Sequence, residues 1–299
     1  MKQLLRFLII CLLTTVLHAQ DETGTFSLNV NSDLMELHVS VVDDKDRTVS
    51  GLTRENFQVT ENGVNQRITV FKHEDIPVSL GLVLDNSRSI EPRKARLDAA
   101  ALSFVRQSNP DDETFVVHFD FEARLDRDFT GKLPELEQTL AASKPFGQTA
   151  IYDAVLLALE NMKKAGHQKR ALLLVTDGLD NSSKAKLNQV LETVKRSRVI
   201  IIVVGLLSAA EGEQAELALT KIAEASGGRA YFPDDVDQAR AYMEKAARDL
   251  RTQYTIGYVP TDTLHDGTWR SVRVNVIPPA GFKGPLEVDY RHGYYRPEP

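Results

Sequence analysis

Two rhythms of apolar positions follow one another along this chain. Over residues 26–71 apolar and polar residues alternate, most clearly in "MELHVSVVD" (Met35–Asp43), which is typical of a strand with one buried face. The segment "FQVTENGVNQRITVF" carries the pair Asn62-Gly63 between two such runs, and this pair is a strong signal for a β-hairpin. No helical periodicity of useful length occurs in this stretch, so we expect a small β unit.

After Pro77 the rhythm changes. Four runs are almost continuously apolar, namely "VSLGLVLD", "TFVVHFD", "RALLLVTD" and "RVIIIVVGLL", as in strands that are covered on both faces. Helical periodicity separates them, and we expect helices over residues 92–107, 133–142, 151–164, 184–196, 213–225 and 236–250. Short strands are expected at residues 123–129 and at "GRAYF". This alternation predicts an α/β fold with a doubly wound, mostly parallel sheet and helices on both faces.

The tail of the chain returns to the strand rhythm. "QYTIGYV", "WRSVRVNVI" and "LEVDYRHGYY" are three strand-like runs. A few strands need something to cover them, and the N-terminal β unit has the same need. We therefore expect the two flanks to pair into one small β-sandwich-like module. The predicted layout is an N-terminal β module at 20–75, the α/β domain at 76–251 and C-terminal strands at 252–299 that pack with 20–75.

The first residues have a pattern of their own. Lys2 and Arg6 precede an apolar run at 7–17 and make its N-terminal side positive. Ala19 stands at a plausible cleavage position after the run. This pattern is typical of a secretory signal peptide over residues 1–19, with an uncleaved anchor as the alternative. Its removal takes away the one cysteine of the chain, and no other segment is long and apolar enough to cross a membrane. We expect an exported protein, periplasmic or secreted, without disulfides.

Composition excludes one class of partner. Hydrophobic residues make up 42% and charged residues 26% of the 299 positions, which is ordinary for a globular protein. The net charge is −6, with acids and bases interspersed, so the clustered basic surface that nucleic-acid binding requires is missing. We expect no nucleic-acid partner.

Acid and hydroxyl side chains gather in three loops of the predicted fold. "DNSRS" supplies Asp85, Ser87 and Ser89 after one strand, Thr149 precedes a helix, and Asp177 ends another strand. Since ligand sites of such folds lie at the carboxyl edge of the sheet, all five are expected at that edge. A set of oxygen donors suits Mg²⁺ or Mn²⁺, or less snugly Ca²⁺. Two carboxylates leave a divalent ion part of its charge, so an acidic side chain of a partner can complete the coordination.

Each loop also has a simpler interpretation. Ser87 or Ser89 can cap the helix that follows, and Thr149 can cap the next one. Asp177 can begin a turn. Any one of these taken alone is the better explanation, but the coincidence of all three loops at one edge favours a metal site.

These residues carry a resemblance to a known family. The chain resembles a von Willebrand factor type A (VWA) domain, whose metal-ion-dependent adhesion site has the pattern D-x-S-x-S, a distant Thr and a distant Asp. Here the pattern is met by Asp85, Ser87 and Ser89, then Thr149, then Asp177. The flanks resemble a bacterial secreted group often labelled VWFA-related. The resemblance implies that the serine and threonine hydroxyls contact the metal directly, while the aspartates often act through water.

The resulting expectation is an exported, non-enzymatic, Mg²⁺-dependent protein-binding module of the adhesion type, whose metal holds an acidic residue of an unknown partner protein. Arg88 lies inside the "DNSRS" loop, and we hypothesise that it adds a second contact to that partner's carboxylate. Two alternatives stay open. One is a metal-dependent hydrolase, although the chain has no G-x-S-x-G elbow and no second acid cluster. The other is an envelope scaffold whose metal is purely structural.

Overall fold

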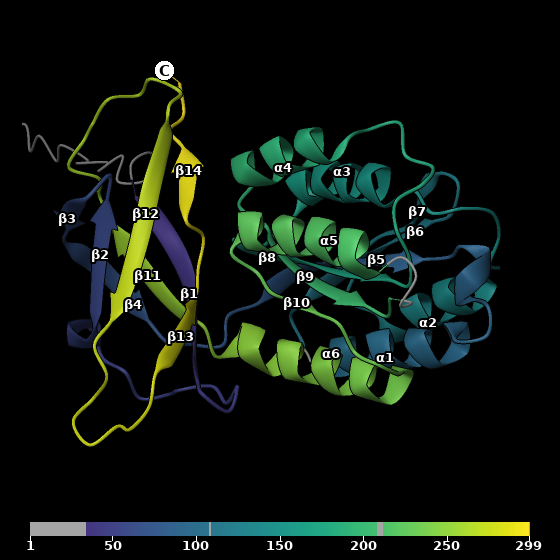
Figure 1. Ribbon diagram of the computed structural model, residues 1–299, viewed down its shortest axis with the longest axis horizontal. Coiled ribbons are helices and arrows are strands. Elements are labelled where there is room, and N and C mark those ends of the chain that lie inside the picture. The colour runs from purple at the N-terminus through teal and green to yellow at the C-terminus, as the bar shows by residue number, and fades with distance from the viewer. Residues whose placement is uncertain (1–33, 108, 208–211, 299) are drawn as a thin grey trace, which may run out of the picture. The chain divides into compact units, whose positions relative to one another are not determined.

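The computed structural model describes residues 34–107, 109–207 and 212–298 (Figure 1). The signal peptide predicted at 1–19 and the first part of the predicted N-terminal β module lie outside the described residues. Within the described part of the chain, no helix combines the length and the apolar character that crossing a membrane would need.

A mixed sheet forms the centre of the α/β region. Among the described residues it has six strands, in the spatial order β10 (Ala230–Tyr231), β9 (Ile200–Gly205), β8 (Lys169–Thr176), β5 (Val78–Asp85), β6 (Glu113–Phe119) and β7 (Ala123–Thr130). Neighbouring strands are parallel except β6 and β7, which are antiparallel. Every residue of β5 and of β9 is buried, because both faces of the sheet are covered.

Helices supply that cover on both faces (Figure 1). One face packs against α1 (Lys94–Arg106), α2 (Leu133–Ala142) and α6 (Val236–Arg251), and the other against α3 (Ile151–Asn161), α4 (Leu187–Arg196) and α5 (Gly212–Ser226). Short 3₁₀ helices occur at η1 (Arg54–Asn56), η2 (Arg88–Ile90) and η3 (Met162–Lys164). The predicted α/β fold, with a mostly parallel sheet between two helical layers, is confirmed.

The flanks form two further sheets, both antiparallel. In the described residues one has the order β13 (Leu286–Asp289), β1 (Met35–Asp43), β11 (Tyr254–Tyr258) and β4 (Ile68–Lys72). The other has the order β14 (Gly293–Tyr295), β12 (Trp269–Val276), β2 (Phe57–Glu61) and β3 (Val64–Gln66). Leu37 and Ile256 of the first sheet share one apolar core with Val59 and Val274 of the second. Strands from both ends of the chain thus build one β module, as the fold-class prediction stated.

The predicted hairpin turn joins β2 to β3. Asn62 and Gly63 have φ angles of 48° and 80°, the left-handed values that a two-residue turn between twisted strands requires. Glycine adopts them without a steric penalty and asparagine at a small one. The α/β region is inserted between β4 and β11, which are neighbours in one sheet, with Lys72 paired to Thr255.

The tail differs from the prediction in one place. The run "LEVDYRHGYY" is two strands instead of one, because β13 pairs with β1 and β14 pairs with β12. Arg291 lies between them, and its Nε donates a hydrogen bond of 2.7 Å to the carbonyl of Gly293. Its guanidinium also donates to the carbonyls of Lys195, in the last turn of α4, and Ser197, directly after it. The bend therefore satisfies carbonyls at a helix C-terminus that lies far away in sequence.

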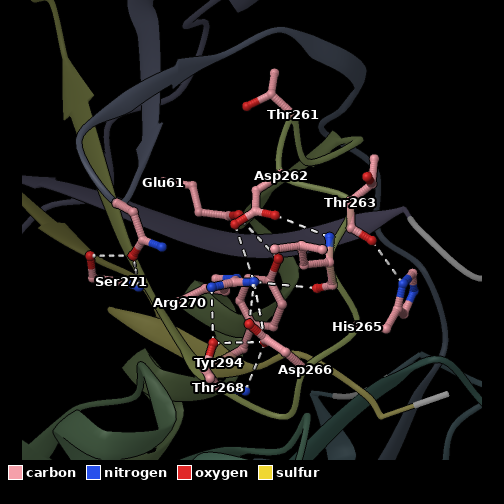
Figure 2. Close-up of polar contacts among 12 residues, drawn as sticks. Glu61, Thr261, Asp262, Thr263, His265, Asp266, Thr268, Arg270, Ser271 and Tyr294 are labelled. Carbon is pink, nitrogen blue, oxygen red and sulfur yellow. Dashed lines mark hydrogen bonds and ion pairs between the residues drawn. The ribbon is translucent and has the colours of Figure 1, made fainter.

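The β module contains a buried acid with internal donors (Figure 2). Glu61 is 3% exposed, and its Oε2 accepts hydrogen bonds of 2.8 Å from the hydroxyls of both Tyr258 and Tyr294. Burial, followed by this carboxylate, raises the pKa of both tyrosines, so the hydroxyls stay protonated and donate. Glu61 is therefore satisfied by its own module.

Next to Glu61, the buried Arg270 contacts several residues of the loop between β11 and β12 (Figure 2). Nη2 of Arg270 lies 3.2 Å from a carboxylate oxygen of Asp262 and 3.2 Å from one of Asp266. Nη1 of Arg270 donates a hydrogen bond of 2.9 Å to the hydroxyl of Thr268. The acids of this loop are thus neutralised within the module.

Charges are also paired at the amino edge of the parallel sheet. Lys169, at the start of β8, is buried and donates to the carbonyl of Leu250 near the end of α6. The neighbouring Arg251 forms ion pairs with Asp112 and, at 2.9 Å, with Asp75. Burial and then the positive charge of Arg251 lower the pKa of Lys169 from 10.5 to about 7.

Candidate metal-ion site

The five predicted oxygen donors lie in loops at the carboxyl edge of the parallel sheet. Asp85 is the last residue of β5, and Asp177 directly follows β8. Because β5 and β8 are parallel neighbours, the two acids leave the sheet at the same edge. Ser87 and Ser89 lie in the loop after β5, and Thr149 lies two residues before α3.

Four of these residues form a continuous row of contacts, which we call the oxygen row: Asp85, Ser87, Ser89 and Asp177. The backbone N–H of Ser87 donates to Oδ1 of Asp85 at 2.8 Å. The hydroxyl oxygens of Ser87 and Ser89 are 3.1 Å apart, and the Ser89 hydroxyl donates to Oδ1 of Asp177 at 2.8 Å. Asp85, Ser87 and Asp177 are buried, whereas Ser89 is exposed. The row is therefore open to solvent at Ser89, between its two buried acids.

Asp85 is held on both of its oxygens. Besides the N–H of Ser87, the hydroxyl of Thr176 donates to its Oδ2 at 2.6 Å. Burial nevertheless raises the pKa of Asp85 from 3.8 to about 6, and the charge of Asp177 also raises it. A cation close to the oxygen row would offset both effects.

Asp177 lacks a donor on one oxygen. Its Oδ1 accepts the hydrogen bond from Ser89, but its buried Oδ2 accepts none from the described residues. The guanidinium of Arg93 lies 3.2 Å from Oδ2, at ion-pair distance, although its N–H groups are not aligned for a hydrogen bond. A buried carboxylate oxygen without a donor is costly. Oδ2 of Asp177 thus has an ion-pair neighbour in Arg93 but no hydrogen-bond donor among the described residues.

Thr149 is attached to the same edge through its backbone. Its N–H donates to Oδ1 of Asn181 at 2.9 Å, and its carbonyl accepts from the N–H of Asn181 at 3.0 Å. Among the described residues, no hydrogen bond joins its hydroxyl to the oxygen row. The structure thus brings four predicted residues into contact and holds the fifth on the adjoining loop.

Helix capping does not account for these residues. Ser87 precedes η2 but makes no capping hydrogen bond with its side chain. The N-cap of α3 is Ala150, not Thr149. In the first turn of α3 the N–H of Tyr152 donates to Oδ1 of Asp180 at 3.1 Å, so Asp180 and not Thr149 accepts this hydrogen bond. The hydroxyls of Ser87 and Thr149 are therefore not used as caps.

Sequence reasoning did not find three residues that shape the site. Thr176 orients Asp85, Arg93 faces Asp177, and Asn181 holds the loop of Thr149. Thr176 immediately precedes Asp177 and Asn181 follows it by four positions, so their place after β8 was the available signal. No signal pointed to Arg93, because its contact depends on how α1 is set against β8.

The donor set fits a hard divalent ion. Within the described residues, no group of three or more His, Cys, Asp or Glu side chains is arranged to hold a metal. An ion at this edge would therefore depend on hydroxyls together with the carboxylates of Asp85 and Asp177. Hydroxyl and carboxylate oxygens are donors that Mg²⁺ and Ca²⁺ accept, whereas Zn²⁺ favours nitrogen and sulfur.

Residues 80–179 match the sequence model of a known domain family, and this stretch contains all five predicted donors. The family is the von Willebrand factor type A domain. The six-stranded sheet between two helical layers is accordingly VWA-like. No curated protein matches the chain significantly.

Solved structures with a TM-score of 0.50 share this VWA-like fold, and a further one matches over a shorter stretch. The PilB minor pilin from Streptococcus sanguinis has a TM-score of 0.50 at 12% identity, over 60% of this chain and 62% of that chain. Proximal thread matrix protein 1 from the mussel byssus, with a zinc-occupied MIDAS motif, has a TM-score of 0.50 at 20% identity, over 62% and 48%. The vWF domain of the type V pili tip protein Mfa5 from Porphyromonas gingivalis has a TM-score of 0.34 at 23% identity, over 36% and 39%. The chain thus spans 39% to 62% of the length of these proteins, and the likeness to the two at a TM-score of 0.50 is one of fold.

Proposed function

We propose that this chain is an exported, non-enzymatic protein-binding module of the adhesion type, which binds its partner through an ion at the oxygen row. The proposed ion is Mg²⁺, with Mn²⁺ or Ca²⁺ as alternatives, and the proposed ligand is an acidic side chain of a partner protein. The observation that carries the proposal is Oδ2 of Asp177, a buried carboxylate oxygen without a hydrogen-bond donor, next to the exposed Ser89.

The residues of the site divide into two roles. Three hydroxyls would contact the ion, those of Ser87, Ser89 and Thr149. Two carboxylates would balance its charge, those of Asp85 and Asp177. Thr176 and the N–H of Ser87 orient the carboxylate of Asp85. A divalent ion bound here would offer one coordination position to a carboxylate from outside.

The choice of ion follows from the donors. The zinc-occupied MIDAS motif of the mussel byssus protein supports a divalent ion at this edge of the fold. In this chain the donors are all oxygens, which favours Mg²⁺, Mn²⁺ or Ca²⁺ over zinc. The two carboxylates equal the charge of a divalent ion, so the proposed acidic partner rests on the coordination position left open to solvent and on the exposed positive charge of Arg88 beside it.

Other observations support a binding role over an enzymatic one. His118 on β6 is fully buried, and its ring nitrogens lie 2.8 Å from Asp126 and 3.3 Å from the hydroxyl of Ser143. It is therefore not free to act as a base at the oxygen row. The similarity of fold to the PilB minor pilin supports the adhesion type, and the proposed export rests on residues 1–19 of the sequence.

The test joins metal binding to partner capture. Mg²⁺ titrations by calorimetry would compare the unmodified protein with Ser87→Ala/Ser89→Ala and with Ser103→Ala, a serine of α1 outside the oxygen row. The same three proteins would then retain partners from the native envelope and secreted fractions, in Mg²⁺ and in EDTA. Circular dichroism would confirm that each sample is folded.

We expect a partner that is retained only by the metal-loaded unmodified protein and by Ser103→Ala. Retention that ignores both EDTA and the double substitution would contradict the proposal. Loss of fold on chelation would assign the metal a structural role instead. Metal-dependent turnover of a phosphoester or peptide that disappears in Asp177→Ala would favour the hydrolase.

A further inference from the structure

Two exposed phenylalanines stand on the loops around the oxygen row. Phe121 follows β6 and is 46% exposed, and Phe146 lies in the loop that leads to Thr149 and is 54% exposed. Their rings contact each other edge to face, with centroids 5.8 Å apart and planes at 81°. Two large apolar side chains are thus gathered at the edge that carries the acids and hydroxyls.

Arg88 lies beside the ring of Phe146 and adds a charged side chain to this surface. It lies between Ser87 and Ser89, and its guanidinium carbon is 6.0 Å from the centre of the Phe146 ring. Arg88 is exposed, and in the described part of the chain it forms no ion pair with an acid. We call Arg88, Phe121 and Phe146 the aromatic rim. It offers an apolar face and a free positive charge beside the proposed ion.

The aromatic rim is held in place by backbone contacts. The N–H of Phe146 donates to the carbonyl of Asn86 at 2.8 Å, and the N–H of Arg88 donates to the carbonyl of Gly147 at 3.3 Å. Gly147 has φ of 73°, and a Cβ there would lie 3.0 Å from the ring of Phe121. Glycine therefore allows the loop to pack closely on that ring. The side chains of Phe146 and Arg88 can change while the loops keep their positions.

Exposure of the aromatic rim has no structural explanation. The phenylalanines Phe104, Phe115 and Phe119 nearby in sequence are buried in the two apolar cores, whereas Phe121 and Phe146 leave about half of their surface in water. Clustered exposed apolar side chains beside polar groups are typical of interaction sites. Aromatic residues and arginine are also the residues most enriched at the energetic centres of interfaces.

We propose that the aromatic rim binds the residues that flank the partner's acid and thereby selects among acidic ligands. The ligand is an exposed segment in which Asp or Glu is followed or preceded, within two positions, by an apolar or aromatic side chain. That apolar side chain packs on Phe121 and Phe146, and Arg88 complements the negative charge of the segment. The inference rests on the proposed function, because the acid itself would bind at the oxygen row. It adds the chemical class of the partner.

The experiment selects ligands without assuming a partner. Random linear heptapeptides displayed on phage would be selected against the full chain in Mg²⁺, and one enriched peptide would be synthesised with a fluorophore. Anisotropy titrations would compare the unmodified protein with Phe146→Ala, Phe146→Leu and Arg88→Ala. Leu217→Ala is the matched control, because Leu217 is a 55% exposed apolar residue on α5, outside the rim. Calorimetry with Mg²⁺ alone would accompany each variant.

We expect enriched peptides to pair an acid with an apolar neighbour. Phe146→Ala should weaken peptide binding about tenfold, Phe146→Leu should restore most of the affinity, and Arg88→Ala should weaken binding most at low salt. Mg²⁺ affinity in Phe146→Ala and peptide affinity in Leu217→Ala should stay unchanged.

Two results would overturn the inference in different ways. Metal-dependent peptides that carry acids without an apolar preference, and that bind Phe146→Ala as tightly as the unmodified protein, would remove the role of the rim and leave the proposed function standing. Peptides that bind equally in EDTA and to Ser87→Ala/Ser89→Ala, or no enrichment over that variant, would overturn both proposals.

Discussion

Two buried acids of this protein differ in what surrounds them. Glu61 in the β module and Asp177 at the carboxyl edge are 3% and 5% exposed. Oε2 of Glu61 accepts hydrogen bonds from Tyr258 and Tyr294, both at 2.8 Å. Oδ2 of Asp177 accepts none from the described residues and only faces Arg93 at 3.2 Å. The two acids are thus similarly buried but differ in the hydrogen-bond donors that the described residues supply to these oxygens.

The β module and the carboxyl edge each hold a cluster of polar residues, and the two clusters have similar residue types. Glu61 and the neighbouring Arg270 cluster bring together several acids, an arginine and hydroxyls (Figure 2), which resembles the composition of a binding site. Each acid there has its donor or cation inside the module. At the carboxyl edge Asp177 faces the partly exposed Arg93 without a hydrogen bond to its Oδ2, while Asp85 is held by Thr176 and the N–H of Ser87.

The largest expected effect tests the two acids directly. Glu61→Ala should lower the free energy of unfolding by about 3 kcal/mol, because two buried hydroxyls lose their acceptor. Asp177→Asn in EDTA should change it by less than about 1 kcal/mol, because the asparagine oxygen can still accept from the Ser89 hydroxyl and the partly exposed Arg93 alone loses an ion pair. Urea denaturation followed by circular dichroism measures both, with the exposed Glu287→Ala as the control. Equal losses from Glu61 and Asp177 would remove the contrast.

Addition of Mg²⁺ should also distinguish the surroundings of Asp177 from those of Glu61. At a hundredfold excess over its dissociation constant, Mg²⁺ should raise the free energy of unfolding by about 2.7 kcal/mol, since it binds the folded state alone. The gain should vanish in Asp177→Asn and persist in Tyr294→Phe, which alters only the β module. Thermal melts at several Mg²⁺ concentrations measure it. A gain that survives in Asp177→Asn would place the ion elsewhere.

Lys169 adds a buried cation to the comparison. Its pKa falls from 10.5 to about 7 on folding, so the unfolded chain binds more protons than the folded one between these values. Stability should therefore rise with pH across that window, by about 2 kcal/mol between about pH 7.5 and pH 9.5. Lys169→Met should lose this slope, as urea denaturation across that range would measure. A slope that is the same in both proteins would contradict burial as the cause.

The smallest expected effect concerns Arg93. Because its guanidinium lies 3.2 Å from Oδ2 of Asp177, it would compete there with the proposed cation. Arg93→Gln should tighten Mg²⁺ binding about threefold to tenfold, since the competing charge is lost. Calorimetry measures the change, and Arg96→Gln, at a neighbouring exposed arginine, is the control. Weaker Mg²⁺ binding in Arg93→Gln would mean that Arg93 orients Asp177 instead.

Much of the fold could be predicted because its signals are local. The apolar run of β5 needs cover on both faces, and the pair Asn62-Gly63 adopts left-handed angles that few other residues tolerate. The split between β13 and β14 could not be predicted in this way. It depends on Arg291, whose acceptors are the carbonyls of Lys195 and Ser197, about a hundred positions away along the chain.

The same division holds at the candidate site. Strand ends predicted that Asp85 and Asp177 would leave the sheet at one edge, because parallel strands share their carboxyl edge. The contact of Arg93 with Asp177 and the meeting of Phe121 with Phe146 depend on how loops and helices are set against each other. No spacing in the sequence encodes those distances. Metal ligation by the five residues stays a prediction.

The pairing of Lys72 with Thr255 has a consequence for how such proteins can be rebuilt. The whole α/β region departs from β4 and returns at β11, two adjacent antiparallel strands that a short turn could join. It is therefore a cassette inserted into a hairpin of the β module. An α/β region with other loops at its carboxyl edge could replace this one if it kept the pairing of β4 with β11 and the carbonyls that Arg291 binds.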